Sequence, residues 1–196
     1  MKLTLTIFLL AISNHLLADY ENGVIYKTNG DTIECLIDVY EPGVLIGNIK
    51  ALQYKIDQDH LSLSLDQISS VELNGNSFHV LTLKEQGEKF FNEEVIISHM
   101  ILAKLIQEGE VNLYQYYYSG NSIYENGKTN KSFGKSLHER PIFKSEDETR
   151  VIYKMTYSSS IKKYFPSNGK EILSKGLKYD EISAAVIEGN RYLANN

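Results

Sequence analysis

Residues 23–39 read GVIYKTNGDTIECLIDV, and this stretch decides the fold. Two runs rich in β-branched residues, 23–28 and 32–39, flank the Asn-Gly-Asp turn at 29–31. Asn-Gly favours a positive φ at both central positions of a tight turn, which makes it the strongest short-range signal for a β-hairpin. The folded part of the chain is therefore expected to open with two antiparallel strands.

Similar short runs continue to residue 83. The runs 48–56 and 61–65 bracket a polar turn, and the runs 70–73 and 77–83 flank Asn-Gly-Asn at 74–76. Short strands at intervals of about ten residues are typical of all-β units. This half of the chain is expected to form a small antiparallel barrel or a curled sheet.

Cys35 is the single cysteine of the 196 residues, so no disulfide can form within the chain. Period-2 alternation places Ile33, Cys35 and Ile37 on one face of the predicted strand. The thiol is therefore expected to point into the core as a small hydrophobic group. The alternative, a reactive or dimer-forming thiol, requires an exposed electropositive site.

The second half mixes strands with a helical tail. The run 96–106 fits either a short helix or a strand, and 111–118 is predicted to be a strand that turns at 119–121. Residues 127–150 are polar and basic and are expected to form a long loop around a short strand near 137–143.

The tail is predicted to be helical over 161–165, 170–175 and 181–193. Pro166 ends the first helix, Ser158 to Ser160 are candidate caps for it, and Asp180 is a candidate cap for the last. An apolar stripe of the last helix includes Ala185, Val186 and Gly189. The predicted fold class is therefore α+β: an N-terminal antiparallel barrel or curled sheet, a further β-hairpin and a short helical C-terminal tail.

Residues 84–94 are polar and mark the predicted seam of the chain. We expect a β-rich subdomain over 19–84 and a hairpin with helical tail over 95–196, packed together as one unit.

The first 18 residues, MKLTLTIFLLAISNHLLA, have the pattern of a secretory signal peptide. Lys2 supplies the basic start, 3–12 the apolar core, and Ala18 a small residue before the expected cut at Asp19. A retained membrane anchor is the weaker alternative, because a bilayer needs about 20 apolar helical residues. The mature chain is expected to be exported, periplasmic or extracellular, and without a transmembrane segment.

Charge is unevenly distributed along the predicted mature chain. Residues 19–126 hold 17 acidic and 6 basic side chains, whereas 127–178 hold 5 acidic and 12 basic ones. The two segments either face each other or stay separately solvated, or the basic one forms a docking surface for an anionic partner. Nucleic acid is not expected as a partner of an acidic exported protein, because phosphate attraction supplies most non-specific affinity.

The chain resembles a group of exported Gram-negative proteins of unassigned function. These proteins open with G-x-I-x-x-x-x-G-D-T-I, which here spans 23–33, and later carry G-x-x-x-L-Y-x-Y, which here spans 109–116. The resemblance implies an exported β-rich domain with a helical tail, and it brings no catalytic residues. Similar proteins usually have glycine in place of Cys35 and a Cys-Pro pair in place of Phe165-Pro166.

Motifs for catalysis, metals and cofactors do not fit. Neither Gly-Lys-Ser/Thr stretch has the upstream glycine of a phosphate-binding loop, and no G-x-S-x-G turn is present. Ser77, His79 and Asp66 are not spaced as a recognisable triad, and the histidines lack metal-ligand spacing. No catalytic residue, metal or cofactor is therefore assigned.

The tyrosine-rich run at 111–118 is the strongest candidate ligand surface. Alternation places three of its rings on one face: Tyr114, Tyr116 and Tyr118. Three lysines of the basic segment are candidate contacts for an anionic ligand: Lys128, Lys131 and Lys135. Exposed rings stack on sugars or aromatic ligands, whereas the simpler interpretation has them fill cross-strand pairs.

The leading interpretation is a non-enzymatic exported domain that binds or supports an envelope polymer or protein. A hydrolase acting on envelope polymers and a purely structural module are the alternatives.

Overall fold

A computed structural model describes residues 19–86, 96–126, 130–146 and 148–195, without the side chains of 85–86, 96–97, 119–126 and 130–136. The predicted signal peptide and most of the predicted seam lie outside the described residues.

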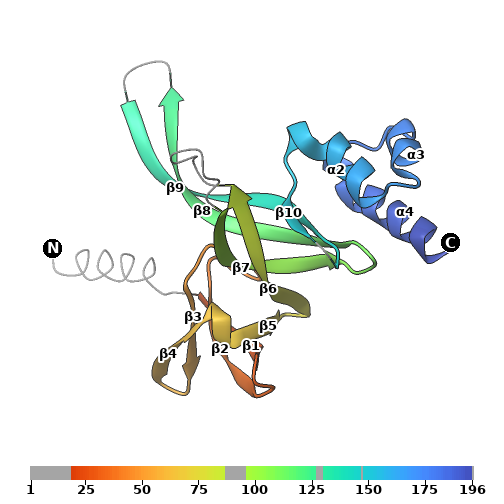
Figure 1. Ribbon diagram of the computed structural model, residues 1–196. Coiled ribbons are helices and arrows are strands. Elements are labelled where there is room, and N and C mark those ends of the chain that lie inside the picture. Colours follow the sequence, from red (N-terminus) through yellow and green to blue (C-terminus); the bar gives the residue numbers. More distant parts are fainter. Residues whose placement is uncertain (1–18, 87–95, 127–129, 147, 196) are drawn as a thin grey trace.

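The described strands form one antiparallel sheet in the order β10-β9-β8-β7-β6-β5-β1-β2-β3-β4 (Figure 1). The strands are β1 (Asp19–Lys27), β2 (Thr32–Val39), β3 (Ala51–Ile56), β4 (Asp59–Ser64), β5 (Ile68–Leu73), β6 (Asn76–Gln86), β7 (Ile96–Gln107), β8 (Asn112–Asn126), β9 (Asn130–Lys144) and β10 (Thr149–Val151). The helical elements are η2 (Leu65–Gln67), η3 (Lys154–Thr156), α2 (Tyr157–Tyr164), α3 (Gly169–Ser174), η4 (Tyr179–Glu181) and α4 (Ile182–Ala194). The β-rich body and the helical C-terminal tail are confirmed.

The predicted N-terminal hairpins are present. β1 pairs with β2 around the turn that contains Gly30, whose φ is 92°. β5 pairs with β6 around Asn74 and Gly75, whose φ values are 49° and 74°. The second turn has a positive φ at both residues, as Asn-Gly favours, whereas in the first turn Gly30 has it and Asn29 does not. In the first turn the N–H of Gly30 instead donates to the carbonyl of Lys27 (3.0 Å).

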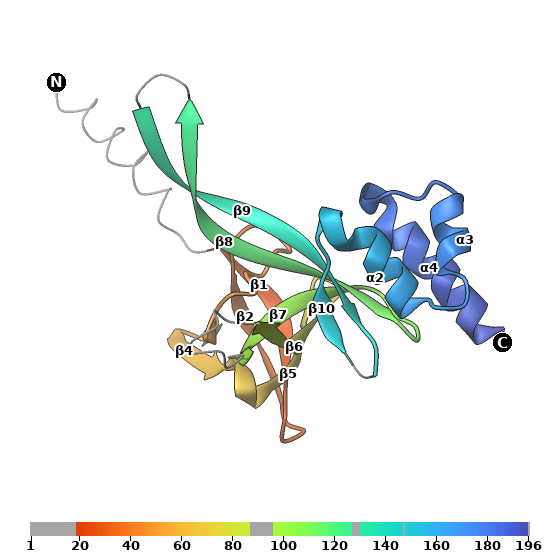
Figure 2. The same cartoon turned by 45° about the horizontal axis from the view of Figure 1, so that its top comes forward.

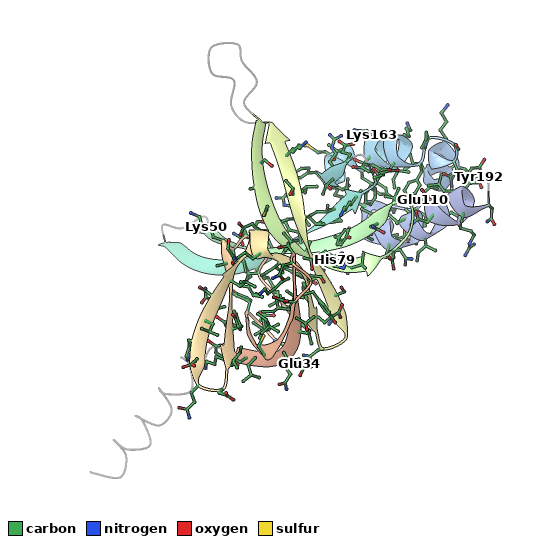
Figure 3. The ribbon with its side chains drawn as sticks, turned by 60° about the horizontal axis from the view of Figure 1, so that its bottom comes forward. Glu34, Lys50, His79, Glu110, Lys163 and Tyr192 are labelled. Atoms are coloured by element: carbon green, nitrogen blue, oxygen red, sulfur yellow. The ribbon has the colours of Figure 1, made fainter. Side chains whose placement is uncertain are left out.

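The connection from β4 to β5 shows that the N-terminal strands curl. β5 pairs with β1, whereas β4 lies at the far edge of the sheet, beyond β2 and β3. In a flat sheet β4 and β5 stand about 19 Å apart, but the three-residue η2 allows a reach of at most about 15 Å. The strands therefore curl round their own core (Figure 3). Since β4 and β5 do not pair, the sheet is curled and not closed into a barrel.

β6 and β7 separate two clusters of buried side chains. Phe78 and Leu102 lie on one face, in the cluster enclosed by the N-terminal strands. Leu81 and Ile101 lie on the other face, in a cluster shared with β8 and β9. This strand pair thus carries buried side chains on both faces, and it joins the two halves of the chain in one continuous sheet.

Predictions for β8 and β9 are partly wrong. Residues 119–121, expected to turn, lie inside β8, and most of the predicted loop 127–150 is the 15-residue β9. The two strands pair in one unbroken register from Asn112↔Lys144 to Asn126↔Asn130. Ladder hydrogen bonds hold this polar sequence extended without the apolar alternation that marks a half-buried strand. The ambiguous run 96–106 lies in the strand β7.

The helices pack at one end of the sheet, beside β8, β9 and β10 (Figure 2). Pro166 follows α2, and the buried stripe of α4 contains Ala185, Val186 and Gly189, as predicted. The predicted caps are wrong: residues 158–160 lie inside α2, and Glu181, not Asp180, precedes α4. No helix among the described residues is both long and apolar enough to cross a membrane.

Cys35 packs against the N-terminal core cluster, on the predicted face of β2, but it is only partly buried. Burial raises the pKa of its thiol to about 11. Little thiolate therefore forms at neutral pH, which makes this cysteine a poor nucleophile.

Gly47 belongs to the loop between β2 and β3. It lies between β7 and β8 at the point where the pairing of these two strands ends, which we call the fork. Its N–H donates to the carbonyl of Tyr117 (2.6 Å), and its carbonyl accepts from the N–H of Leu102 (3.1 Å). A Cβ at this position would overlap the Leu102 carbonyl oxygen and lie 2.6 Å from the ring of Tyr116. Gly47 therefore joins the N-terminal loop to both strands and fixes the place of Tyr116.

Candidate functional site

The β8–β9 ladder brings four partly exposed side chains to one face. Tyr116 lies opposite Arg140, and Tyr118 lies opposite His138. Directly opposed residues of antiparallel strands share a face of the sheet. The same face is buried at Tyr114, nearer the body, and becomes partly exposed at these four positions.

Three of these side chains form a row of nearly parallel rings. The ring centroids of Tyr116 and Tyr118 are 5.4 Å apart with an interplanar angle of 20°. Those of Tyr118 and His138 are 5.2 Å apart with an angle of 28°. Such separations and angles are those of offset-stacked aromatic rings. The row crosses from β8 to β9 and offers flat apolar surface beside polar ring atoms.

Arg140 extends the row toward η3. Its Nε donates to the Tyr118 hydroxyl (2.9 Å), and this hydrogen bond is the main cause that raises the pKa of Arg140. The guanidinium carbon lies 5.4 Å from the ring centroid of Tyr118 and 4.7 Å from that of Tyr153, so both rings contact the cation. Tyr153 is 42% exposed. We call Tyr116, Tyr118, His138, Arg140 and Tyr153 the aromatic–arginine face.

Tyr114 does not belong to this surface, although the sequence grouped it with Tyr116 and Tyr118. Its side chain is 2% exposed and packs in the cluster formed by β6, β7, β8 and β9. Alternation predicts the shared face correctly, but it does not show where along that face the core ends.

Lys128 and the side chains of Lys131 and Lys135 lie outside the described residues, so their contact with a ligand stays a prediction. Among the described residues, Arg140 is the cation of the basic segment that contacts the stacked rings.

A hydrogen-bonded chain links β6 to β8. Ser77 Oγ lies 3.0 Å from His79 Nε2, and His79 Nδ1 lies 3.1 Å from the hydroxyl oxygen of Tyr114. The tautomer of His79 decides which of these two contacts it donates and which it accepts. A nucleophilic serine needs a histidine whose other ring nitrogen is held by a carboxylate, and here that nitrogen contacts a tyrosine hydroxyl.

The same chain predicts how stability depends on pH. Burial, followed by the nearby charge of Lys144, lowers the pKa of His79 in the folded protein. Below the unfolded pKa of about 6.5, the unfolded chain binds more protons than the folded one. Lowering the pH through this range therefore lowers the free energy of unfolding, until the pH is below the folded pKa as well. His79→Gln is expected to weaken this fall, measured as the urea midpoint at pH 7.5 and at pH 5.5.

Ser77→Ala is the matched control, because it removes the partner hydroxyl but keeps the titrating imidazole. It is expected to retain the pH dependence of the parent protein. Equal pH dependence in His79→Gln and the parent would show that His79 does not carry this part of the acid sensitivity.

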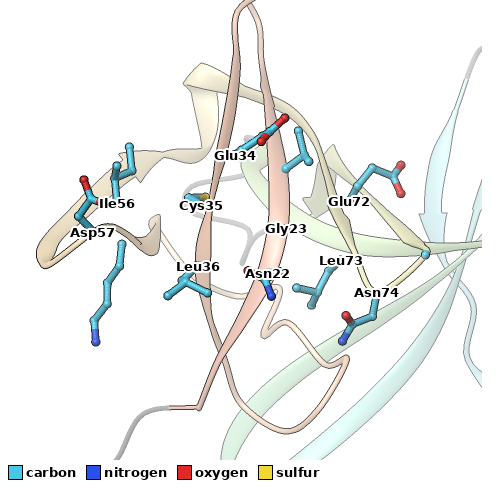
Figure 4. A pocket seen from close by; sticks show the side chains of 13 residues that line it. Asn22, Gly23, Glu34, Cys35, Leu36, Ile56, Asp57, Glu72, Leu73 and Asn74 are labelled. Carbon is cyan, nitrogen blue, oxygen red and sulfur yellow. The ribbon is translucent and has the colours of Figure 1, made fainter.

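An open hollow of about 670 Å³ lies over β5, β1, β2 and β3 (Figure 4). Glu34 and Glu72 lie on either side of Val24, with which each is paired in the sheet. The lining contains no aromatic ring and no histidine, and its cysteine is poorly ionised. Among the described residues, no group of three or more His, Cys, Asp or Glu side chains is arranged to hold a metal ion. The hollow therefore offers less recognisable binding chemistry than the aromatic–arginine face.

Sequence reasoning missed Arg140, His138 and Tyr153 as members of one site. They follow Tyr118 by 20 to 35 positions: His138 and Arg140 lie in the short strand predicted near 137–143, and Tyr153 lies beyond the predicted loop. The register of β9 with β8 brings His138 and Arg140 beside Tyr118, and the connection after β10 brings Tyr153 to Arg140. The available signal was the wide spread of basic residues in 127–178, which does not single out one arginine.

Comparison with protein-family models, with curated proteins and with solved structures finds no match to this chain.

Proposed function

We propose that this chain is an exported, non-enzymatic binding module whose aromatic–arginine face binds a ring-bearing polymer of the cell envelope. The observation that carries the proposal is the row of stacked rings at Tyr116, Tyr118 and His138, partly exposed and continued by Arg140 and Tyr153. Export, to the periplasm or beyond, is supported by the pattern of residues 1–18 and by the resemblance to exported Gram-negative proteins.

The chemistry of the face suits sugar rings. The C–H faces of a sugar pack on aromatic rings, whose hydroxyl and imidazole groups supply hydrogen bonds at the edges. Stacking of this kind survives high salt, because 1 M salt shortens the Debye length to about 3 Å but does not screen apolar contact. A polymer that repeats the ring gains further from several weak contacts along one chain.

The test is retention of the purified protein on immobilised envelope polysaccharides in 0.1 M and 1 M salt. Tyr118→Ala removes the central ring and is expected to weaken retention about tenfold, equal to about 1.4 kcal/mol, at both salt concentrations. Tyr26→Ala is the matched control, because Tyr26 is 38% exposed on β1, away from the face. Retention of the control is expected to equal that of the parent.

Two outcomes overturn the proposal. No retention of the parent on any polymer favours a structural module, in which the rings serve the sheet alone. New reducing ends in the bound polymer, lost in Ser77→Ala, favour a hydrolase in which Ser77 is the nucleophile and His79 its base.

A further inference from the structure

Arg140 is a cation surrounded by tyrosines. Its electrostatic neighbours are Tyr118, Tyr153 and Tyr179. No described carboxylate lies within ion-pair distance of its guanidinium, although five such pairs occur elsewhere in the described residues. Tyrosine rings attract the cation but carry no net negative charge, so none of the described neighbours of Arg140 compensates its charge.

The guanidinium also has open donors. Nε is committed to the Tyr118 hydroxyl, and the two Nη groups make no hydrogen bond to a described residue. Four N–H donors therefore remain in a rigid planar fork that matches the two oxygens of a carboxylate. Bidentate pairs of this kind are shorter and stronger than neutral hydrogen bonds.

We propose that Arg140 is a subsite for the carboxylate of an acidic sugar, whose ring extends the row formed by Tyr116, Tyr118 and His138. This inference rests on the proposed function and narrows its ligand to polymers of uronic acids. The ring centroids of Tyr118 and Tyr153 lie 5.4 Å and 4.7 Å from the guanidinium carbon, so an anion that pairs with the fork stands beside two aromatic rings. A uronic acid supplies both required elements, since its carboxylate is attached directly to the sugar ring.

The experiment compares a polyuronate with the same polymer after reduction of its carboxyl groups to alcohols. The parent protein is expected to bind the polyuronate about 10- to 100-fold more tightly, measured by calorimetry or by retention. Arg140→Gln is expected to bind both polymers with the affinity that the parent has for the neutral one. Arg140→Lys keeps the charge without the planar fork, so it is expected to lose most of the discrimination.

Arg150→Gln is the matched control, because Arg150 is an exposed cation on the neighbouring strand β10. This substitution removes one positive charge, as Arg140→Gln does, but it leaves the aromatic–arginine face unchanged. The variant is expected to keep the preference for the polyuronate. Far-UV circular dichroism and thermal melting of each variant show whether it is folded.

Failure of the inference and failure of the proposed function give different results. Equal binding of both polymers by the parent, abolished by Tyr118→Ala, overturns the carboxylate subsite and keeps the stacking site. Binding of neither polymer overturns both. Tighter binding of a sulfated polymer of matched charge, or discrimination lost equally in Arg140→Gln and Arg150→Gln, shows a general anion effect and overturns the carboxylate assignment.

Discussion

Replacement of Phe143 by alanine is expected to lower the free energy of unfolding by about 3 to 5 kcal/mol. Phe143 lies on β9, is 0% exposed, and packs edge-on against Tyr164 and Phe165, at centroid distances of 5.3 and 6.4 Å. It is thus a principal contact between the sheet and the helical tail. Truncation removes buried apolar surface and leaves a cavity at that contact. Urea denaturation measures the loss.

Hydrogen exchange locates the effect. Phe143→Ala is expected to speed amide exchange in α2, α3 and α4 more than in the N-terminal strands. Phe78→Ala is the matched control, since Phe78 is also 0% exposed but lies in the N-terminal core cluster. Its exchange pattern is expected to be the reverse. Identical patterns for both variants would show that the tail and the sheet unfold as one cooperative unit.

The same contact bears on the candidate site. Tyr153 and Tyr179 flank Arg140 from segments next to the helices, and the Tyr179 hydroxyl donates to the carbonyl of Ile152. Arg140 itself lies on β9, as Phe143 does. A shift of the helices would move Tyr153 and Tyr179 relative to Arg140, so loss of Phe143 is expected to weaken polymer binding as well as stability.

Local signals explain which parts of the fold were predictable. The turns at Gly30 and Asn74-Gly75 depend on residues that are adjacent in sequence, and their hairpins were predicted. The apolar stripe at Ala185 and Val186 is equally local, and α4 was predicted within one residue at each end. In both cases the pattern that the sequence shows is the cause of the structure.

Non-local pairing explains what was missed. The short strand predicted near 137–143 is part of β9, but the polar stretch before it, with Gly134, has no apolar period that marks it as a strand. Its conformation depends on its register with β8. The hydrophobic periodicity of a single strand does not predict which other strand it pairs with. The contact of His79 with Tyr114 spans 35 positions and arises from the order of strands in the sheet. Arg140 gained its tyrosine neighbours in the same way.

Gly47→Ala is expected to cost about 1 to 3 kcal/mol of unfolding free energy, the usual range for overpacking, and to displace Tyr116. The added methyl group would overlap the carbonyl oxygen of Leu102 and lie within 2.7 Å of two atoms of the Tyr116 ring. To avoid these overlaps, the loop between β2 and β3 must move, and this movement strains the hydrogen bonds of Gly47 to Leu102 and Tyr117. Urea denaturation reports the first effect, and tyrosine near-UV circular dichroism reports the second.

Gly30→Ala separates crowding from backbone strain. Gly30 has a φ of 92° and open space around its Cα, so alanine there costs about 1 to 2 kcal/mol through its backbone conformation alone. It is expected to leave the tyrosine signal and polymer retention unchanged, because it lies in the turn between β1 and β2, whereas the stacked rings lie on β8 and β9. Gly47→Ala is expected to change both, since Tyr116 begins the row on which the ligand ring depends. If Gly47→Ala lowers stability but retains polymer as the parent does, Tyr116 is packing for the fork between β7 and β8, and the ligand contacts begin at Tyr118.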